Sequence, residues 1–370
     1  MSKFCPLPFS HIAIRPNGRV FPCCNFRWDG VPEDLHLDHP DVFYHPYLEN
    51  IREQMRRGEL VDGCNNCYLS EEKTGKSMRQ FFLERVDEYG MPSEPTDNIN
   101  ITYLDLALSN ACNNKCRMCN AELSTSWYSD WKALGRSIPK GLLEKPKVLE
   151  NYDLSKLKFL KLIGGEPLME QLKFIDVLTR CNRKELSILL TTNSTLIPNE
   201  ELFSLIKECK SFKVNLSIDA FESLNDFLRK GSKWDKTVEV IKWFYDNFSH
   251  SDVTVFGVVS IYNINMLDKL YLFLKENFPK ISLTYIMVDG PDWMSPKHLP
   301  ENIKSLLLKR ISLWENKINI PIWNLIRNEF AKNGDFREFI RQDKKLNDLR
   351  NEFWGDHNPE LYEMVKNFYE

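Results

Sequence analysis

Three closely spaced cysteines are the first residues of this chain whose type and position indicate chemistry. The segment LDLALSNACNNKCRMC places three residues between Cys112 and Cys116 and two between Cys116 and Cys119. A structural zinc site uses four ligands, but the next cysteine and histidine along the chain are Cys181 and His250. A 4Fe-4S cluster held by three thiolates leaves one iron open to a non-protein ligand. The triplet therefore indicates such a cluster, with three buried or zinc-binding cysteines as the alternative.

A second motif, GGEP at residues 164–167, ends the next strand-like run of the sequence. Ligands of parallel sheets gather at the carboxyl ends of the strands. Glycine lets the backbone approach a bound ligand closely, and the carboxylate of Glu166 offers a partner to an ammonium group. Alone, GGEP also fits an ordinary turn. Its position one strand-helix unit after CNNKCRMC favours a ligand site that both motifs share.

With these two motifs the chain resembles the radical S-adenosylmethionine (SAM) superfamily, whose CxxxCxxC loop and GGE motif match residues 112–119 and 164–166. The resemblance covers roughly residues 101–290 and implies a partial (β/α)6 barrel. It implies that the open iron of the cluster binds the amino and carboxylate groups of SAM, and that the reduced cluster cleaves SAM to a 5'-deoxyadenosyl radical. The residues implied to bind the methionyl ammonium group are Gly164, Gly165 and Glu166.

Three further segments resemble weaker motifs of the same family. LLTTNS, VNLSIDAF and FLRKGSKW resemble its TNG, SxD and RxG neighbourhoods, although Ser194 and Ala220 replace glycines that are common after the first two. Met118 stands where an aromatic residue is frequent, and its backbone would contact the adenine. Arg229 suits a carboxylate because a planar guanidinium group engages both oxygens. The implied SAM contacts, each with a turn, cap or surface role as the alternative, are Met118, Asn193, Ser217, Asp219 and Arg229.

A second set of cysteines precedes these motifs. Cys5, Gly18 and Cys23 are followed, after a gap, by Cys64 and Cys67 with two residues between them. This spacing resembles the auxiliary-cluster pattern of the twitch and SPASM extensions of radical SAM enzymes. The second half of a SPASM pattern is absent, so the resemblance implies one auxiliary 4Fe-4S cluster, located before the barrel instead of after it. Because four thiolates leave no open iron, we expect this cluster to transfer electrons.

A zinc site is the alternative for these four cysteines, because zinc also takes four thiolates. Cys24 adjoins a predicted ligand and would either replace Cys23 or be a packed thiol. Ten cysteines in a chain without an export signal argue against a disulfide framework. The irregular spacing of the histidines favours solvated or hydrogen-bonding roles over metal ligation for His11, His36, His39 and His45.

Parallel strands are needed to position the motifs, and the pattern from residue 101 onward predicts six. Apolar runs alternate with helical periodicity and without hairpin turns, which indicates right-handed β-α crossovers. The predicted strands are residues 103–108, 159–163, 186–192, 213–219, 253–261 and 283–288. We therefore expect an α/β fold with an irregular twitch-like module at 1–95, a partial (β/α)6 barrel at 96–290, and a helical C-terminal extension at 291–370 that packs on the barrel.

Composition and charge exclude several classes of protein. With 42% apolar residues the chain has enough material for a core, and its formal net charge of -3 provides no field that would attract nucleic acid or an anionic membrane. No apolar run approaches the ~20 residues that cross a bilayer, and the first residues contain no apolar signal region. We expect a cytoplasmic protein.

These observations together predict an oxygen-sensitive radical SAM oxidoreductase or maturase. The expected substrate is a peptide, a protein or a small metabolite, and the expected electron donor is a protein such as flavodoxin or ferredoxin. One rival is a redox-neutral isomerase or epimerase acting on a nucleotide or amino sugar, and another is a non-enzymatic metal-binding protein. A SAM methyltransferase is disfavoured because no glycine-rich turn opens a Rossmann-like unit.

Overall fold

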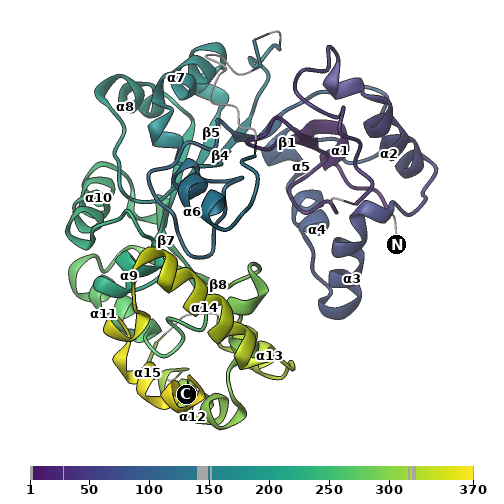
Figure 1. The fold of residues 1–370 in the computed structure, drawn as a ribbon. Coiled ribbons are helices and arrows are strands. Elements are labelled where there is room, and N and C mark those ends of the chain that lie inside the picture. Colours follow the sequence, from purple (N-terminus) through teal and green to yellow (C-terminus); the bar gives the residue numbers. More distant parts are fainter. Residues whose placement is uncertain are drawn as a thin grey trace. The chain divides into compact units, whose positions relative to one another are not determined.

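A computed structural model describes residues 3–27, 29–139, 149–150, 152–315, 317–318 and 322–369 of the chain (Figure 1). In this described part the fold is mixed α/β, with an eight-stranded, mostly parallel sheet in the order β2-β1-β3-β4-β5-β6-β7-β8. The chain divides into two compact units. Unit 1 comprises Met1–Ala111, Pro139–Thr191 and Pro198–Phe212, and unit 2 comprises Cys112–Ile138, Thr192–Ile197 and Lys213–Glu370.

Unit 1 holds the N-terminal strands and the first strands of the parallel series. Its strands are β1 (His11–Ile14), β2 (Val20–Phe21), β3 (Tyr103–Ala107), β4 (Phe159–Ile163) and β5 (Ser187–Thr192), the last of which ends at the unit boundary. Its helices are α1 (Leu7–Ser10), α2 (Pro46–Arg56), α3 (Asn65–Thr74), α4 (Met78–Leu83), α5 (Val86–Tyr89), α7 (Gln171–Arg180) and α8 (Glu200–Lys207).

Unit 2 holds the later strands together with the C-terminal helices. Its strands are β6 (Ser211–Ser217), which begins at the unit boundary, β7 (Val253–Val259) and β8 (Ser282–Met287). Its helices are α6 (Tyr128–Ala133), α9 (Ser223–Leu228), α10 (Trp234–Asn247), α11 (Leu267–Asn277), α12 (Glu301–Glu315), α13 (Trp323–Phe330), α14 (Phe336–Arg350) and α15 (Pro359–Val365). None of the helices in the described residues is both long and apolar enough to cross a membrane.

All six strands predicted from residue 101 onward are present as β3 to β8. They follow chain order across the sheet, and the pairs β3-β4, β4-β5, β6-β7 and β7-β8 are parallel. Burial alternates along β7, whereas every residue of β3 is buried. Continuous burial is the pattern of a strand covered on both faces, and alternating burial is that of a strand with one less covered face. The predicted α/β fold is confirmed, and its strand order is that of a partial (β/α)6 barrel.

The N-terminal segment is more regular than its sequence indicates. β1 pairs with β3 in parallel, with Ile12 opposite Leu104, and β2 pairs with β1 in antiparallel fashion. The sequence HIAI carries only a four-residue signal, and its pairing partner lies some ninety residues away along the chain. The sheet therefore extends into the region predicted to be irregular.

Candidate active site

The cysteine loop, which we define as residues 112–119, is hydrogen-bonded through its backbone to the end of α9 and the segment that follows it. The amide of Lys115 donates to the carbonyl of Lys230 and that of Arg117 to the carbonyl of Leu228, both at 2.8 Å. Gly231 has a φ of +112°, and a Cβ atom there would lie 2.5 Å from the carbonyl oxygen of Asn113. The glycine of the RKG sequence is therefore required because the cysteine loop passes directly against it.

The thiols of this loop lie in a low-dielectric environment. Cys112 and Cys116 are buried and Cys119 is partly buried. Burial disfavours the charged thiolate and raises the pKa of Cys116 to about 12 and that of Cys119 to about 11, with the neighbouring thiols adding to the effect. Thiols of this kind become thiolates when a metal centre replaces their protons.

Two of the predicted SAM contacts reach the sulfur atoms of the loop. The side-chain amide of Asn193 donates to Cys112 Sγ at 3.6 Å and to the side-chain oxygen of Asn113 at 2.7 Å. A guanidinium nitrogen of Arg229 donates to Cys116 Sγ at 3.8 Å. Such N–H donors stabilise negative charge on sulfur. The donor set of the loop thus fits a cluster held by three thiolates.

Arg229 also forms a buried ion pair with another predicted contact, Asp219. The distance from Arg229 Nε to Asp219 Oδ2 is 2.8 Å, and the other carboxylate oxygen accepts from the amide of Val258 at 2.9 Å. Although burial disfavours the charged form, Asp219 and then Cys116 hold the pKa of Arg229 above its usual value. Ser217 lies nearby at the end of β6 and is partly buried. The roles of these residues toward SAM stay predictions.

The GGE motif belongs to unit 1, where it packs against the turn that leaves β3. The amide of Gly165 donates to the carbonyl of Ser109 at 3.0 Å, and the amide of Glu166 to that of Ala111 at 2.6 Å. A Cβ atom on Gly165 would lie 2.1 Å from the Ala111 oxygen, and Gly164 has a φ of +114°. The two glycines therefore allow a close backbone contact with the residue just before Cys112. The sequence suggested only that they open space for a ligand.

Glu166 has a structural role of its own. Its side chain is 1% exposed and accepts a hydrogen bond from the amide of Leu168 at 3.0 Å, which caps the short helical turn Pro167–Met169. The turn interpretation of GGEP thus has a geometric basis. That the same carboxylate also binds an ammonium group stays a prediction.

Ser194 occupies the position at which the family commonly has glycine, and its backbone conformation explains that preference. Its φ is +64°, in the left-handed region that L-residues with side chains rarely adopt. The side chain is buried, and its hydroxyl oxygen has no hydrogen-bond partner among the described residues. This strained residue directly follows Asn193.

Arg117, between the second and third cysteine, was not among the predicted site residues but holds the cysteine loop to the C-terminal extension. Its guanidinium group is fully buried, donates to Asn347 Oδ1 at 2.6 Å and to Glu352 Oε2 at 2.8 Å, and lies 3.8 Å over the ring of Phe227. Asp343 lies 3.7 Å from it. These acceptors are more than two hundred residues away in sequence, so no local signal identifies them.

A second ion-pair bridge connects the same elements. Asp130 on α6 accepts from Lys115 Nζ and from Arg350 Nε, both at 2.7 Å. Burial alone favours the neutral acid, but the hydrogen bonds from Lys115 and Arg350 hold the pKa of Asp130 below its ordinary value. Arg350 also lies over the ring of Trp127, at 4.4 Å. Within unit 2, the C-terminal extension therefore packs on the cysteine loop and α6.

Unit 1 brings the four N-terminal cysteines into electrostatic reach of one another. Cys5 and Cys67 are buried, and Cys23 and Cys64 are partly buried. Burial, together with the neighbouring Cys67, raises the pKa of Cys64 to about 12. Burial and the nearness of Cys5 and Cys64 raise that of Cys23. The side-chain amide of Asn25 donates to Cys67 Sγ at 3.4 Å. Four thiols are the residue type that iron-sulfur ligation uses, and their binding of an auxiliary cluster stays a prediction.

Cys24 has a different environment from Cys23, because its thiol contacts the sulfur of Met78 at 3.8 Å. The four histidines of the segment make hydrogen bonds to the backbone, as expected from their spacing: His11 with Pro22, His36 with Asn17, His39 with Asp41 and His45 with Tyr47. Gly18 has a φ of +81° and leaves room for the ring of His36. In the part of the chain that the structure describes, no group of three or more His, Cys, Asp or Glu side chains surrounds a single-ion position.

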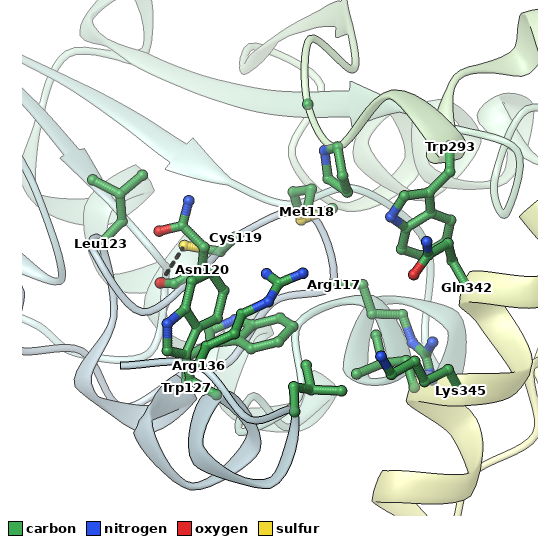
Figure 2. A pocket seen from close by; sticks show the side chains of 15 residues that line it. Arg117, Met118, Cys119, Asn120, Leu123, Trp127, Arg136, Trp293, Gln342 and Lys345 are labelled. Carbon is green, nitrogen blue, oxygen red and sulfur yellow. Dashed lines mark hydrogen bonds between the residues drawn. The ribbon is translucent and has the colours of Figure 1, made fainter. Parts of the chain in front are cut away.

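Met118 and Cys119 line a pocket of about 520 Å³ within unit 2 (Figure 2). Helix α14 forms part of its wall, through Gln342 and Lys345. The C-terminal extension therefore shapes the surroundings of the third cysteine.

A known family model matches the part of the chain that carries these motifs. Residues 106–274 match the family model of the Radical SAM superfamily. This stretch contains the whole cysteine loop, the GGE motif, and the Asp219 and Arg229 pair. It leaves the N-terminal cysteines and the C-terminal extension outside the match.

Individual proteins and solved structures are similar to parts of this chain. The GTP 3',8-cyclase of Aliarcobacter butzleri (strain RM4018) is 27% identical over 129 residues, which are 32% of this chain and 35% of that protein. Native anSMEcpe with bound AdoMet aligns with a TM-score of 0.41 and 21% identity over 56% of this chain and 59% of its own. Streptococcus suis SuiB bound to S-adenosylmethionine aligns with a TM-score of 0.37 and 15% identity over 76% of this chain and 61% of its own. The chain thus spans about a third of the length of its curated relative.

Proposed function

We propose, because residues 106–274 match the family model of the Radical SAM superfamily, that this protein is an enzyme that reductively cleaves S-adenosylmethionine and abstracts a hydrogen atom from a C–H bond of its substrate. The observation that carries the proposal is the cysteine loop. Its three thiols, two buried and one partly buried, lie in one loop after β3, and two of them accept hydrogen bonds from Asn193 and Arg229. This arrangement supports a three-thiolate cluster with an open iron.

The chain's own residues would hold and shield this centre. When bound, the cluster supplies an electron to the SAM sulfonium, which yields methionine and a 5'-deoxyadenosyl radical. Cys112, Cys116 and Cys119 would be the thiolate ligands, and Asn193 and Arg229 would stabilise the charge on two of their sulfurs. Glu166 would accept a hydrogen bond from the methionyl ammonium group, with Gly164 and Gly165 keeping its backbone in place.

The net reaction that we propose is an oxidation of a peptide, a protein or a small metabolite. Transfer of a hydrogen atom to the 5'-deoxyadenosyl radical gives 5'-deoxyadenosine and a substrate radical. Loss of one further electron and one proton from that radical gives a product two electrons more oxidised than the substrate. Cys5, Cys23, Cys64 and Cys67 would hold the auxiliary 4Fe-4S cluster that receives this electron. The first electron would come from a cytoplasmic protein such as flavodoxin or ferredoxin.

Metal analysis combined with a SAM cleavage assay tests the proposal. Protein reconstituted without oxygen should contain about eight irons and eight inorganic sulfides per chain, and should form 5'-deoxyadenosine from SAM after reduction with dithionite. A variant with Cys112, Cys116 and Cys119 replaced by alanine should lose the second property entirely. Four irons with one zinc would contradict the auxiliary cluster, and the absence of iron would contradict the radical mechanism. SAM binding without cleavage by the iron-loaded protein would indicate a non-enzymatic binding protein.

A further inference from the structure

The pocket beside the cysteine loop has the size of a small-molecule site. Its volume of about 520 Å³ lies within the ~300–1,000 Å³ that is usual for such sites. Three segments of unit 2 form its walls: the end of the cysteine loop with α6, the turn after β8, and α14. Figure 2 shows Asn120 and Leu123 on one side of the pocket and Gln342 and Lys345 on the opposite side.

The charges that line this pocket are all positive. Arg117, Arg136 and Lys345 contribute to it, and none of its lining residues is acidic. Arg117 forms an ion pair with Glu352, and this carboxylate neutralises its charge. Arg136 and Lys345 are exposed, and neither forms an ion pair with a carboxylate of the described residues. Within the described part of the chain the pocket therefore presents two unpaired cations to a ligand, which favours an anion.

The apolar part of the wall is aromatic. Trp127, Trp131 and Trp293 line the pocket, and the guanidinium group of Arg136 lies 4.5 Å over the ring of Trp131. Indole rings offer flat surfaces on which a planar ligand stacks. The side chain of Gln342 adds an amide that both donates and accepts hydrogen bonds.

We propose that this pocket binds the substrate, and that the substrate is a planar aromatic molecule of mononucleotide size that carries a phosphate or carboxylate group. Arg136 and Lys345 would hold the anionic group, and the tryptophans would stack on the ring. Met118 and Cys119 mark the end of the pocket where the cluster and SAM would lie, so the substrate would occupy the part lined by Arg136, Lys345 and the tryptophans. This inference rests on the proposed function for the claim that the ligand is a substrate, but the binding itself is tested independently.

Binding is measured by calorimetry on the iron-loaded, unreduced protein with saturating SAM, so that any adenosine-binding site for SAM is filled and no turnover occurs. The probes are two matched pairs: GMP with guanosine, and N-acetyltryptophan with N-acetyltryptophanamide. We expect the charged member of at least one pair to bind about tenfold more tightly than its neutral partner. Preference for GMP identifies a phosphate ligand, and preference for N-acetyltryptophan identifies a carboxylate ligand. Equal affinity within both pairs, or no binding of either charged probe at millimolar concentration, would overturn the proposal.

Variants locate the bound probe in the pocket. Arg136→Gln combined with Lys345→Gln should weaken the charged probe about tenfold and leave its neutral partner unchanged, whereas Lys132→Gln, on an exposed lysine of α6, should change neither. Trp293→Leu should weaken both members of a pair, because it removes a stacking surface. Unchanged affinity in the double variant would also overturn the proposal. Probe binding without 5'-deoxyadenosine formation would contradict the proposed function alone, and cleavage of SAM without probe binding would contradict the pocket alone.

Discussion

Arg117 and Glu352, 235 residues apart in sequence, form a 2.8 Å ion pair that joins the cysteine loop to the C-terminal extension. The guanidinium group is completely buried, and Asn347 and Asp343 supply further acceptors. Arg117, one of the two residues between the second and third cysteine of the motif, is therefore an anchor. The position of the loop depends on a segment that the family match does not include.

Replacing Arg117 by Met should lower the free energy of unfolding by about 3 kcal/mol, because it leaves Asp343 and Glu352 without their buried cation. Arg117→Lys should cost less, since it keeps the charge but loses the forked donor geometry. Urea unfolding followed by circular dichroism measures both. Lys344→Met changes an exposed residue of α14, the helix that carries Asp343, and is the control. Its free energy of unfolding should stay within about 0.5 kcal/mol of the wild-type value. A loss below 1 kcal/mol in Arg117→Met would show that the anchor is unimportant for stability.

The pair of Asp130 with Arg350 should make stability depend on acid pH. The folded-state pKa of Asp130 lies below the ordinary value of 3.8, so this carboxylate stabilises the fold above that pH, and the contribution is lost as pH falls through the folded-state pKa. Asp130→Asn should therefore cost about 2 kcal/mol at pH 7 and progressively less below pH 3.8. Unfolding curves of both proteins over this range measure the difference. A difference that does not change with pH would mean that the charge of Asp130 contributes nothing.

Glu166→Gln separates the two roles assigned to this side chain. Glutamine retains an oxygen that accepts from the Leu168 amide, so the turn and the unfolding free energy should be unchanged. It removes the negative charge, so SAM affinity should fall about tenfold if the carboxylate binds the methionyl ammonium group. Calorimetry with SAM on the iron-loaded protein checks this, with iron content as the control for cluster assembly. Wild-type affinity would leave Glu166 with its capping role only.

Ser194→Gly should stabilise the protein by about 1 kcal/mol. Glycine adopts the positive φ of this position without a steric cost, and the change removes a buried hydroxyl that has no partner among the described residues. Thermal and urea unfolding measure the gain. Asn351→Gly is the matched control, because Asn351 also has a positive φ but asparagine tolerates it better. A destabilised Ser194→Gly variant would show that the hydroxyl makes an essential contact when SAM or the cluster is bound.

Replacing Cys64 and Cys67 by alanine should lower the iron content from about eight to about four per chain. SAM cleavage should continue without coupled oxidation, because the substrate radical would lose its electron acceptor. Cys181→Ala with Cys209→Ala is the control and should keep all the iron. Circular dichroism and SAM binding must first show an intact fold, since metal binding stabilises small cysteine-rich modules. Full product formation at the wild-type ratio to 5'-deoxyadenosine would favour a redox-neutral isomerase.

Features that depend on short stretches of chain could be predicted before the fold was known. Alternating apolar strands and helices from residue 101 onward identified β3 to β8, because local periodicity reports which face of an element is buried. The spacing of Cys112, Cys116 and Cys119 indicated an iron-sulfur site, because one short loop carries all three thiols. The histidines of the N-terminal segment make the hydrogen bonds that their irregular spacing favoured.

Relations between distant segments depend on the packing of the folded chain. β1 joins β3, Gly165 must lack a side chain because Ala111 passes beside it, and Arg117 meets Glu352. The three cations and three tryptophans that line the pocket likewise come from separate segments of unit 2. Each of these contacts joins residues that no local pattern relates, because a contact of this kind is fixed by packing of the whole unit and leaves no periodicity in the chain.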